Sequence, residues 1–116
     1  MPNEESYEDF EIEFTPEFKR NVRHLAKKYR HFKSDIQPVL DTLASGKLVG
    51  VRVPKVKYAV YKVRAKNSDL TKGKSAGYRL IYCIPSKRKI VLVTVFSKTE
   101  QGDISPAKIR EIMERY

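Results

Sequence analysis

The hydrophobic and polar positions change their period near the middle of the chain. In the first half, residues 10–14 (FEIEF) alternate strictly, which predicts a short strand with Phe10, Ile12 and Phe14 turned inward. Thr15-Pro16 has the residue types of a helix N-cap and first turn, and apolar residues then recur at helical spacing as far as Phe32. Residues 34–37 (SDIQ) have the pattern of a capping box, which predicts a second helix that ends near Gly46.

The second half of the chain has the period of two that is typical of strands. Apolar and basic residues alternate in residues 61–66 (YKVRAK). Residues 78–84 (YRLIYCI) and 90–97 (IVLVTVFS) predict a hairpin, whose second strand is apolar on both faces and so belongs inside the sheet. Ser105-Pro106 begins a last helix.

This order of elements, β-α-α-β-β-β-α, indicates an α+β domain that spans residues 1–116. We expect a small antiparallel sheet with the two N-terminal helices packed on one face, followed by a C-terminal helix. The other face is then free to carry Lys62, Arg64 and Lys66.

The charge of the chain is concentrated in one region. The formal net charge is +10, yet the first fourteen residues hold six acidic residues and no basic one. Residues 47–98 hold fourteen Lys and Arg against a single acid, Asp69. A solvated lysine-rich surface is one interpretation. An anionic partner explains the concentration better, with nucleic acid first and an acidic protein or membrane surface second.

Several classes of function are disfavoured by what the chain lacks. The lone Cys83 excludes an intramolecular disulfide and a cysteine-based metal cluster, which fits a reducing cytoplasm. The acidic start and the absence of a long apolar run predict no signal peptide and no membrane span. His24 and His31 make a poor metal site, and residues 72–75 (KGKS) match only the end of a phosphate-binding loop. We therefore expect a cytoplasmic protein, and the residues offer no good metal site.

The basic residues are the remaining candidates for a functional site. The predicted sheet brings them to one rim: Lys62, Arg64, Lys72, Lys74, Arg79 and Lys98. Four tyrosines lie among these basic residues in the sequence: Tyr58, Tyr61, Tyr78 and Tyr82. Their rings could stack on nucleic-acid bases, but packing in the protein core is the commoner role.

Two of these segments also carry a family pattern. Residues 61–64 (YKVR) and 76–82 (AGYRLIY), in this order, resemble the signature of the RelE/ParE toxin superfamily. The resemblance continues through residues 97–105 and the last helix, and the loop TKGKSAG is most similar to the HigB-like, RelE-type branch. It implies the toxin of a type II toxin–antitoxin pair. Such a toxin is an mRNA interferase that cleaves the message in the ribosomal A site, uses no cofactor and is neutralised by a cognate antitoxin.

The resemblance also implies roles for individual residues. Arg64 and Arg79 correspond to positions that stabilise the charge of the scissile phosphate, Lys62 to substrate positioning or proton transfer, and Lys98 to a candidate acid or base. Arginine suits the first role because it stays charged and clamps phosphate, while crowded lysines have lowered pKa values. The expected RNA-binding residues are Lys66, Lys72, Lys74 and Tyr78, with Lys74 a further candidate acid or base.

Two positions depart from the best-known RelE pattern. Thr99 stands where an Arg follows the Lys, and Ser105 stands where a Tyr is found. Two alternatives therefore remain open. One is a ParE-like inhibitor of DNA gyrase, and the other is a catalytically inactive member of the fold that binds RNA or the ribosome.

Overall fold

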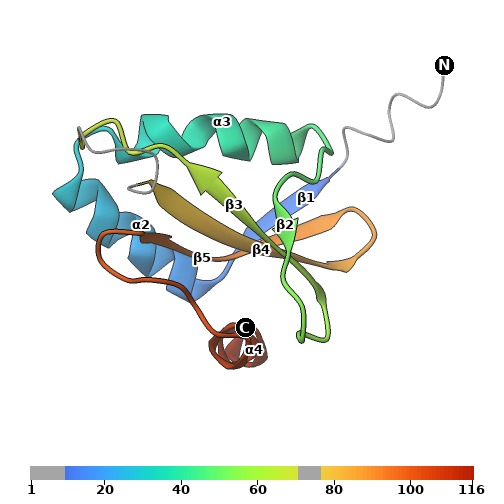
Figure 1. Ribbon diagram of the computed structural model, residues 1–116. Helices are drawn as coiled ribbons and strands as arrows, with labels where there is room; N and C mark the ends of the chain where they lie inside the picture. Colours follow the sequence, from blue (N-terminus) through green and yellow to red (C-terminus); the bar gives the residue numbers. More distant parts are fainter. Residues whose placement is uncertain (1–9, 71–76) are drawn as a thin grey trace, which may run out of the picture.

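The computed structural model describes residues 10–70 and 77–116 (Figure 1). In this part of the chain the predicted order of elements is confirmed. One two-residue strand, at residues 51–52, is added before the three long strands of the second half. The elements are β1 (Glu11–Phe14), α2 (Pro16–Lys28), α3 (Phe32–Ala44), β2 (Val51–Arg52), β3 (Ala59–Ala65), β4 (Tyr78–Ser86), β5 (Lys89–Ser97) and α4 (Pro106–Arg115).

The strands form one sheet in the order β1-β5-β4-β3-β2. All neighbours are antiparallel except β1, which pairs parallel to β5. The interior position predicted for residues 90–97 is confirmed, because β5 lies between β1 and β4. Arg64 of β3 stands directly opposite Arg79 of β4, and two residues along the ladder Lys62 stands opposite Ile81.

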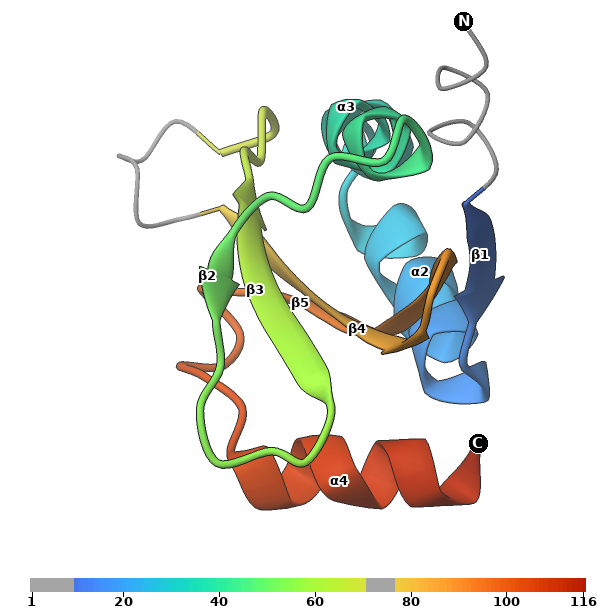
Figure 2. The same cartoon turned by 90° about the vertical axis from the view of Figure 1, so that its right-hand side faces the viewer.

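Helices cover both faces of the sheet, as Figures 1 and 2 show. Helices α2 and α3 lie on one face, as predicted, over a core that includes Leu25, Phe32, Tyr78 and Leu80. Helix α4 lies on the opposite face over a second, smaller core, where Ile109 and Ile112 pack against Val60, Ile81, Cys83 and Val93. Lys62 and Arg64 belong to this second face, since their neighbours Tyr61 and Val63 pack toward α2 and α3.

The start of α2 is as predicted, but the start of α3 is not. Thr15 caps α2, where its hydroxyl accepts a hydrogen bond from the Phe18 amide. Helix α3 begins at Phe32 rather than at the predicted capping box, since the hydroxyl of Ser34 donates to the His31 carbonyl instead of accepting from a backbone amide. The next residue, Asp35, is buried, and its carboxylate accepts hydrogen bonds from the Ser68 amide and hydroxyl. The amide of His31, at the N-cap, is bound by Asp69. The predicted stop is confirmed, since Gly46 has φ +93° just after α3.

The edge strand β1 corrects a second prediction. Phe10 and Ile12 pack against the core, but the side chain of Phe14 is exposed, because β1 ends there at the edge of the sheet. Beyond this point the side chain of Asn21, from α2, hydrogen-bonds to β5 in place of a neighbouring strand. Its amide oxygen accepts hydrogen bonds from the Thr94 hydroxyl at 2.7 Å and the Val95 amide at 3.1 Å.

Candidate anion-binding site

Two arginines form the centre of the site. Arg64 and Arg79, here called the arginine pair, are cross-strand neighbours on the face that α4 covers only in part. Arg79 is 7% exposed, since it lies between Arg64 on β3 and Phe96 on β5. Arg64 stays exposed at the surface. The pair therefore combines a buried guanidinium with one that reaches solvent.

The arginine pair has no acidic partner within ion-pair distance among the described residues. The guanidinium of Arg79 donates a hydrogen bond to the Tyr78 carbonyl at 3.2 Å. Burial and, secondly, the charge of Arg64 lower the pKa of Arg79, while Asp103 acts in the opposite direction. An arginine remains protonated even so. A buried cation without a counter-ion is unfavourable, so the pair favours binding of an anion from outside.

Lys62 differs from the arginine pair because it already has a partner. Its ammonium group lies 2.9 Å and 3.1 Å from the two carboxylate oxygens of Asp103. Burial raises the pKa of Asp103, but hydrogen bonds from Lys62 and from the Ile104 amide outweigh it and hold that pKa below its usual value. Asp103 is therefore ionised at neutral pH and neutralises Lys62.

Sequence reasoning did not identify Asp103 as part of this site. The contact joins residues 41 apart in the chain, from a strand to the connecting segment, residues 98–105, that links β5 to α4. The one signal in the sequence is that Glu100 and Asp103 follow directly on the strongly basic residues 47–98.

The remaining predicted site residues are placed as follows. Lys98 lies near the ion pair of Lys62 with Asp103, because its charge contributes to the lowered pKa of Asp103. Its ammonium group donates a hydrogen bond to the Gly102 carbonyl at 2.8 Å. Lys66 is exposed just beyond the end of β3. Lys72 and Lys74 lie outside the described residues.

Tyr78 is the predicted RNA-binding residue that we do not retain. Its side chain is 0% exposed and packs edge-on against the rings of Tyr29 and Phe32, on the face of α2 and α3. It therefore presents no ring surface on which a base could stack. Burial raises the pKa of Tyr78, which keeps its hydroxyl neutral.

The two positions that depart from the RelE pattern take part in local contacts of the fold. The hydroxyl of Thr99 lies 2.9 Å from that of Ser97 and 3.4 Å from that of Tyr29. The hydroxyl of Ser105 caps α4, where it accepts a hydrogen bond from the Lys108 amide.

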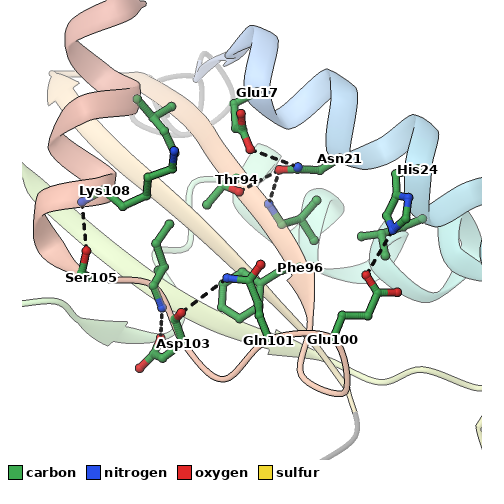
Figure 3. A pocket seen from close by; sticks show the side chains of 14 residues that line it. Glu17, Asn21, His24, Thr94, Phe96, Glu100, Gln101, Asp103, Ser105 and Lys108 are labelled. Atoms are coloured by element: carbon green, nitrogen blue, oxygen red, sulfur yellow. Dashed lines mark hydrogen bonds and ion pairs between the residues drawn. The ribbon is translucent and has the colours of Figure 1, made fainter.

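A groove beside the site shows how the connecting segment is held. Figure 3 shows it between α2, the end of β5 and the residues leading into α4. The carboxylate of Glu100 lies 3.1 Å from His24 Nε2 and 2.9 Å from Lys28 Nζ, so it fastens the segment to α2. No group of three or more His, Cys, Asp or Glu residues in the described part of the chain is arranged to hold a metal ion.

This fastening predicts a pH dependence of stability. Burial alone would raise the pKa of Glu100. Hydrogen bonds from Lys28 and His24 outweigh burial, so the net pKa is below the ordinary 4.5. A carboxylate with a lowered pKa stabilises the fold above its unfolded pKa and loses that effect as pH falls through the folded value. We expect Glu100→Gln to cost at most about 1 kcal/mol at pH 7, since the groups are partly exposed, and less at pH 3.

Urea unfolding at the two pH values measures this difference. Glu114→Gln is the matched control, because Glu114 is an exposed carboxylate on α4. An equal effect of Glu100→Gln at both pH values would contradict the ionic role of Glu100.

Comparison with known proteins adds a family to this geometry. A family model described as ParE toxin of type II toxin-antitoxin system, parDE, matches residues 12–102. No curated protein matches the chain. Within the described residues, no helix is long and apolar enough to cross a membrane.

Proposed function

The chain belongs to the RelE/ParE toxin superfamily of type II toxin–antitoxin systems, and we propose that it acts as a ribosome-dependent mRNA endonuclease. Membership implies a cognate antitoxin as partner. The observation that supports an RNA target is the arginine pair: a buried guanidinium beside an exposed one, without an acidic partner among the described residues. Arginine forks bind phosphate oxygens in a bidentate manner, and RNA supplies phosphates in a fixed repeat.

In this proposal the arginine pair stabilises the transition state. A ribose 2′-oxygen attacks the adjacent phosphorus, the bond to the 5′-oxygen breaks, and a 2′,3′-cyclic phosphate and a 5′-hydroxyl result. The attack adds negative charge to the phosphoryl oxygens, which Arg64 and Arg79 are placed to offset. One proton leaves the 2′-hydroxyl and one reaches the 5′-oxygen. Lys98 is our candidate for these transfers, with Lys74 a second from the sequence, while Lys62, which is paired with Asp103, positions the substrate.

Mapping of message ends tests this function. The protein is induced in growing cells, and the 5′ ends of cellular mRNAs are sequenced before and after induction. We expect new ends at defined positions within codons, and purified protein should cut a message on translating ribosomes but not the same message alone. A growth block with intact messages would contradict the proposal.

Inhibition of DNA gyrase is the second candidate function. The family model that matches the chain is described as the ParE toxin, and Thr99 and Ser105 make local fold contacts where the RelE pattern has Arg and Tyr. A supercoiling assay with purified gyrase separates the two functions. Inhibition of supercoiling together with intact messages would favour the ParE-like activity.

A further inference from the structure

A hollow of about 340 Å³ lies beside the arginine pair, on the same face of the sheet. Its floor and walls come from β2 and the residues after it, from β4, and from the start of α4, which Figure 2 shows close to the loop that follows β2. The apolar lining consists of Val51, Val53, Pro54, Ile81, Ile104, Pro106 and Ile109. This size is at the lower end of small-molecule sites, which span roughly 300–1,000 Å³.

The lining is mostly apolar, and one of its side chains is widely exposed. Ile81 and Ile109 are both fully buried, whereas Val51 at the edge is 70% exposed, which is unusual for a branched apolar side chain. The charged residues of the wall are Arg52 and the ion pair of Lys62 with Asp103. A ligand that covers Val51 and meets this ion pair therefore needs both an apolar face and a polar edge.

The position of the hollow relative to the arginine pair matches the shape of a nucleotide. The row of Lys62 and Ile81 is two residues from the row of Arg64 and Arg79. Strands rise about 3.3 Å per residue, so the two rows are roughly 7 Å apart. In a nucleotide, a ribose of similar span separates the phosphate from its base. A phosphate on the arginine pair thus places a base at the hollow.

The ion pair selects among bases by the order of its polar groups. The two oxygens of Asp103 are acceptors and the ammonium of Lys62 is a donor, so together they offer acceptor, acceptor and donor. The pairing edge of guanine carries the complement: the donors N2–H and N1–H, and the acceptor O6. No other RNA base has two adjacent N–H groups on that edge. In the free protein both Asp103 oxygens are bound by Lys62, and the side chains are 33% (Lys62) and 59% (Asp103) exposed, so solvent reaches the pair and weakens the contact that a base would have to replace.

We propose that this hollow binds a guanine base of the RNA strand whose phosphate lies on the arginine pair. The inference rests on the proposed function and names the nucleotide that the site prefers. Lys62 and Asp103 are then the residues that determine specificity, and the apolar lining holds the plane of the base. The protein reads single-stranded RNA in this way, through the pairing edge of an unstacked base.

Nuclear magnetic resonance titration of the full chain tests the proposal. The probes are the four ribonucleoside 5′-monophosphates and inorganic phosphate, each titrated separately. We expect guanosine monophosphate to shift the methyl signals of Val51, Ile104 and Ile109 and to bind at least about fivefold more tightly than the other three. Inorganic phosphate should shift the signals of Arg64 and Arg79 and leave these methyl signals unchanged.

Asp103→Asn is the informative variant. It replaces one acceptor by a donor at nearly the same size, so the preference for guanosine monophosphate should fall below about twofold. Phosphate binding should persist, because the variant removes a negative charge from the cluster. Asp41→Asn, an exposed change on α3, is the matched control and should keep the preference.

The outcomes separate this inference from the proposed function. Equal binding of the four nucleotides, no shift with any of them, or an unchanged preference in Asp103→Asn would overturn the base site. Cleavage of messages in cells would still support the nuclease in each case. Conversely, a guanine preference that depends on Asp103, together with intact cellular messages, would support the base site and contradict the nuclease.

Discussion

Replacing Arg79 by alanine is expected to lower the rate of mRNA cleavage about 100- to 1,000-fold, which is the usual cost of losing one preorganised donor to a developing oxyanion. Toxicity in growing cells should disappear with it. The reason is position: Arg79 is buried between Arg64 and Phe96 in the sheet, and its guanidinium is hydrogen-bonded to the Tyr78 carbonyl, so it needs little reorganisation when charge develops on the phosphate. Single-turnover cleavage on programmed ribosomes measures the rate.

The same variant should leave stability unchanged or raise it. Arg79 is buried without an acidic partner among the described residues, so its removal relieves a desolvated charge. Arg79→Lys should retain the charge but lose the two-pronged guanidinium contact, so its cleavage rate should lie between those of the wild type and Arg79→Ala. Arg23→Ala, an exposed arginine on α2, loses the same charge away from the site and serves as the control.

Two results would contradict this role. Unchanged cleavage by Arg79→Ala would place the chemistry elsewhere on the protein. A large fall in melting temperature would instead make Arg79 a structural residue, whose loss affects the rate only through folding.

The second large effect is expected at Gly77, where β3 and β4 approach closely. A Cβ atom added there would lie 2.4 Å from the carbonyl oxygen of Ala65, which belongs to the backbone and cannot turn away. We expect Gly77→Ala to lower the free energy of unfolding by about 2–3 kcal/mol, as is typical of overpacking a close contact. The change would also shift the start of β4, and with it Arg79. Urea denaturation measures the loss.

Gly102→Ala is the matched control for this prediction. A Cβ atom at Gly102 meets nothing within 4 Å, although it lies in the connecting segment near the same site. Its effect should stay within about 0.5 kcal/mol. Equal stability of the two variants would show that the strands can separate at Ala65 without cost.

The parts of this structure that follow from local pattern were predictable. The period of two in residues 61–66 placed Lys62 and Arg64 on one face, and the hairpin pattern around Arg79 placed that arginine beside them. The Thr15 cap and the Gly46 stop also follow from the preferences of neighbouring backbone groups.

Contacts between distant segments were not predictable in this way. The carboxylate of Asp35 binds Ser68, which is 33 residues away, and Asp69 accepts a hydrogen bond from the His31 amide, 38 residues away, at the start of α3. The ion pair of Lys62 with Asp103 and the burial of Tyr78 likewise depend on packing across the sheet. A period of two says which side a residue faces, but not what covers that side.

The side chain of Asn21 has a consequence for behaviour in concentrated solution. Where β1 ends at Phe14, β5 would otherwise leave its amide and carbonyl groups open to the strand of another molecule. Asn21 binds the Val95 amide, and the Thr15 hydroxyl binds the Val93 carbonyl at 2.7 Å. Both residues belong to the folded helix and its cap, so they shield this stretch of strand from joining copies into fibrils even though its sequence is almost wholly apolar.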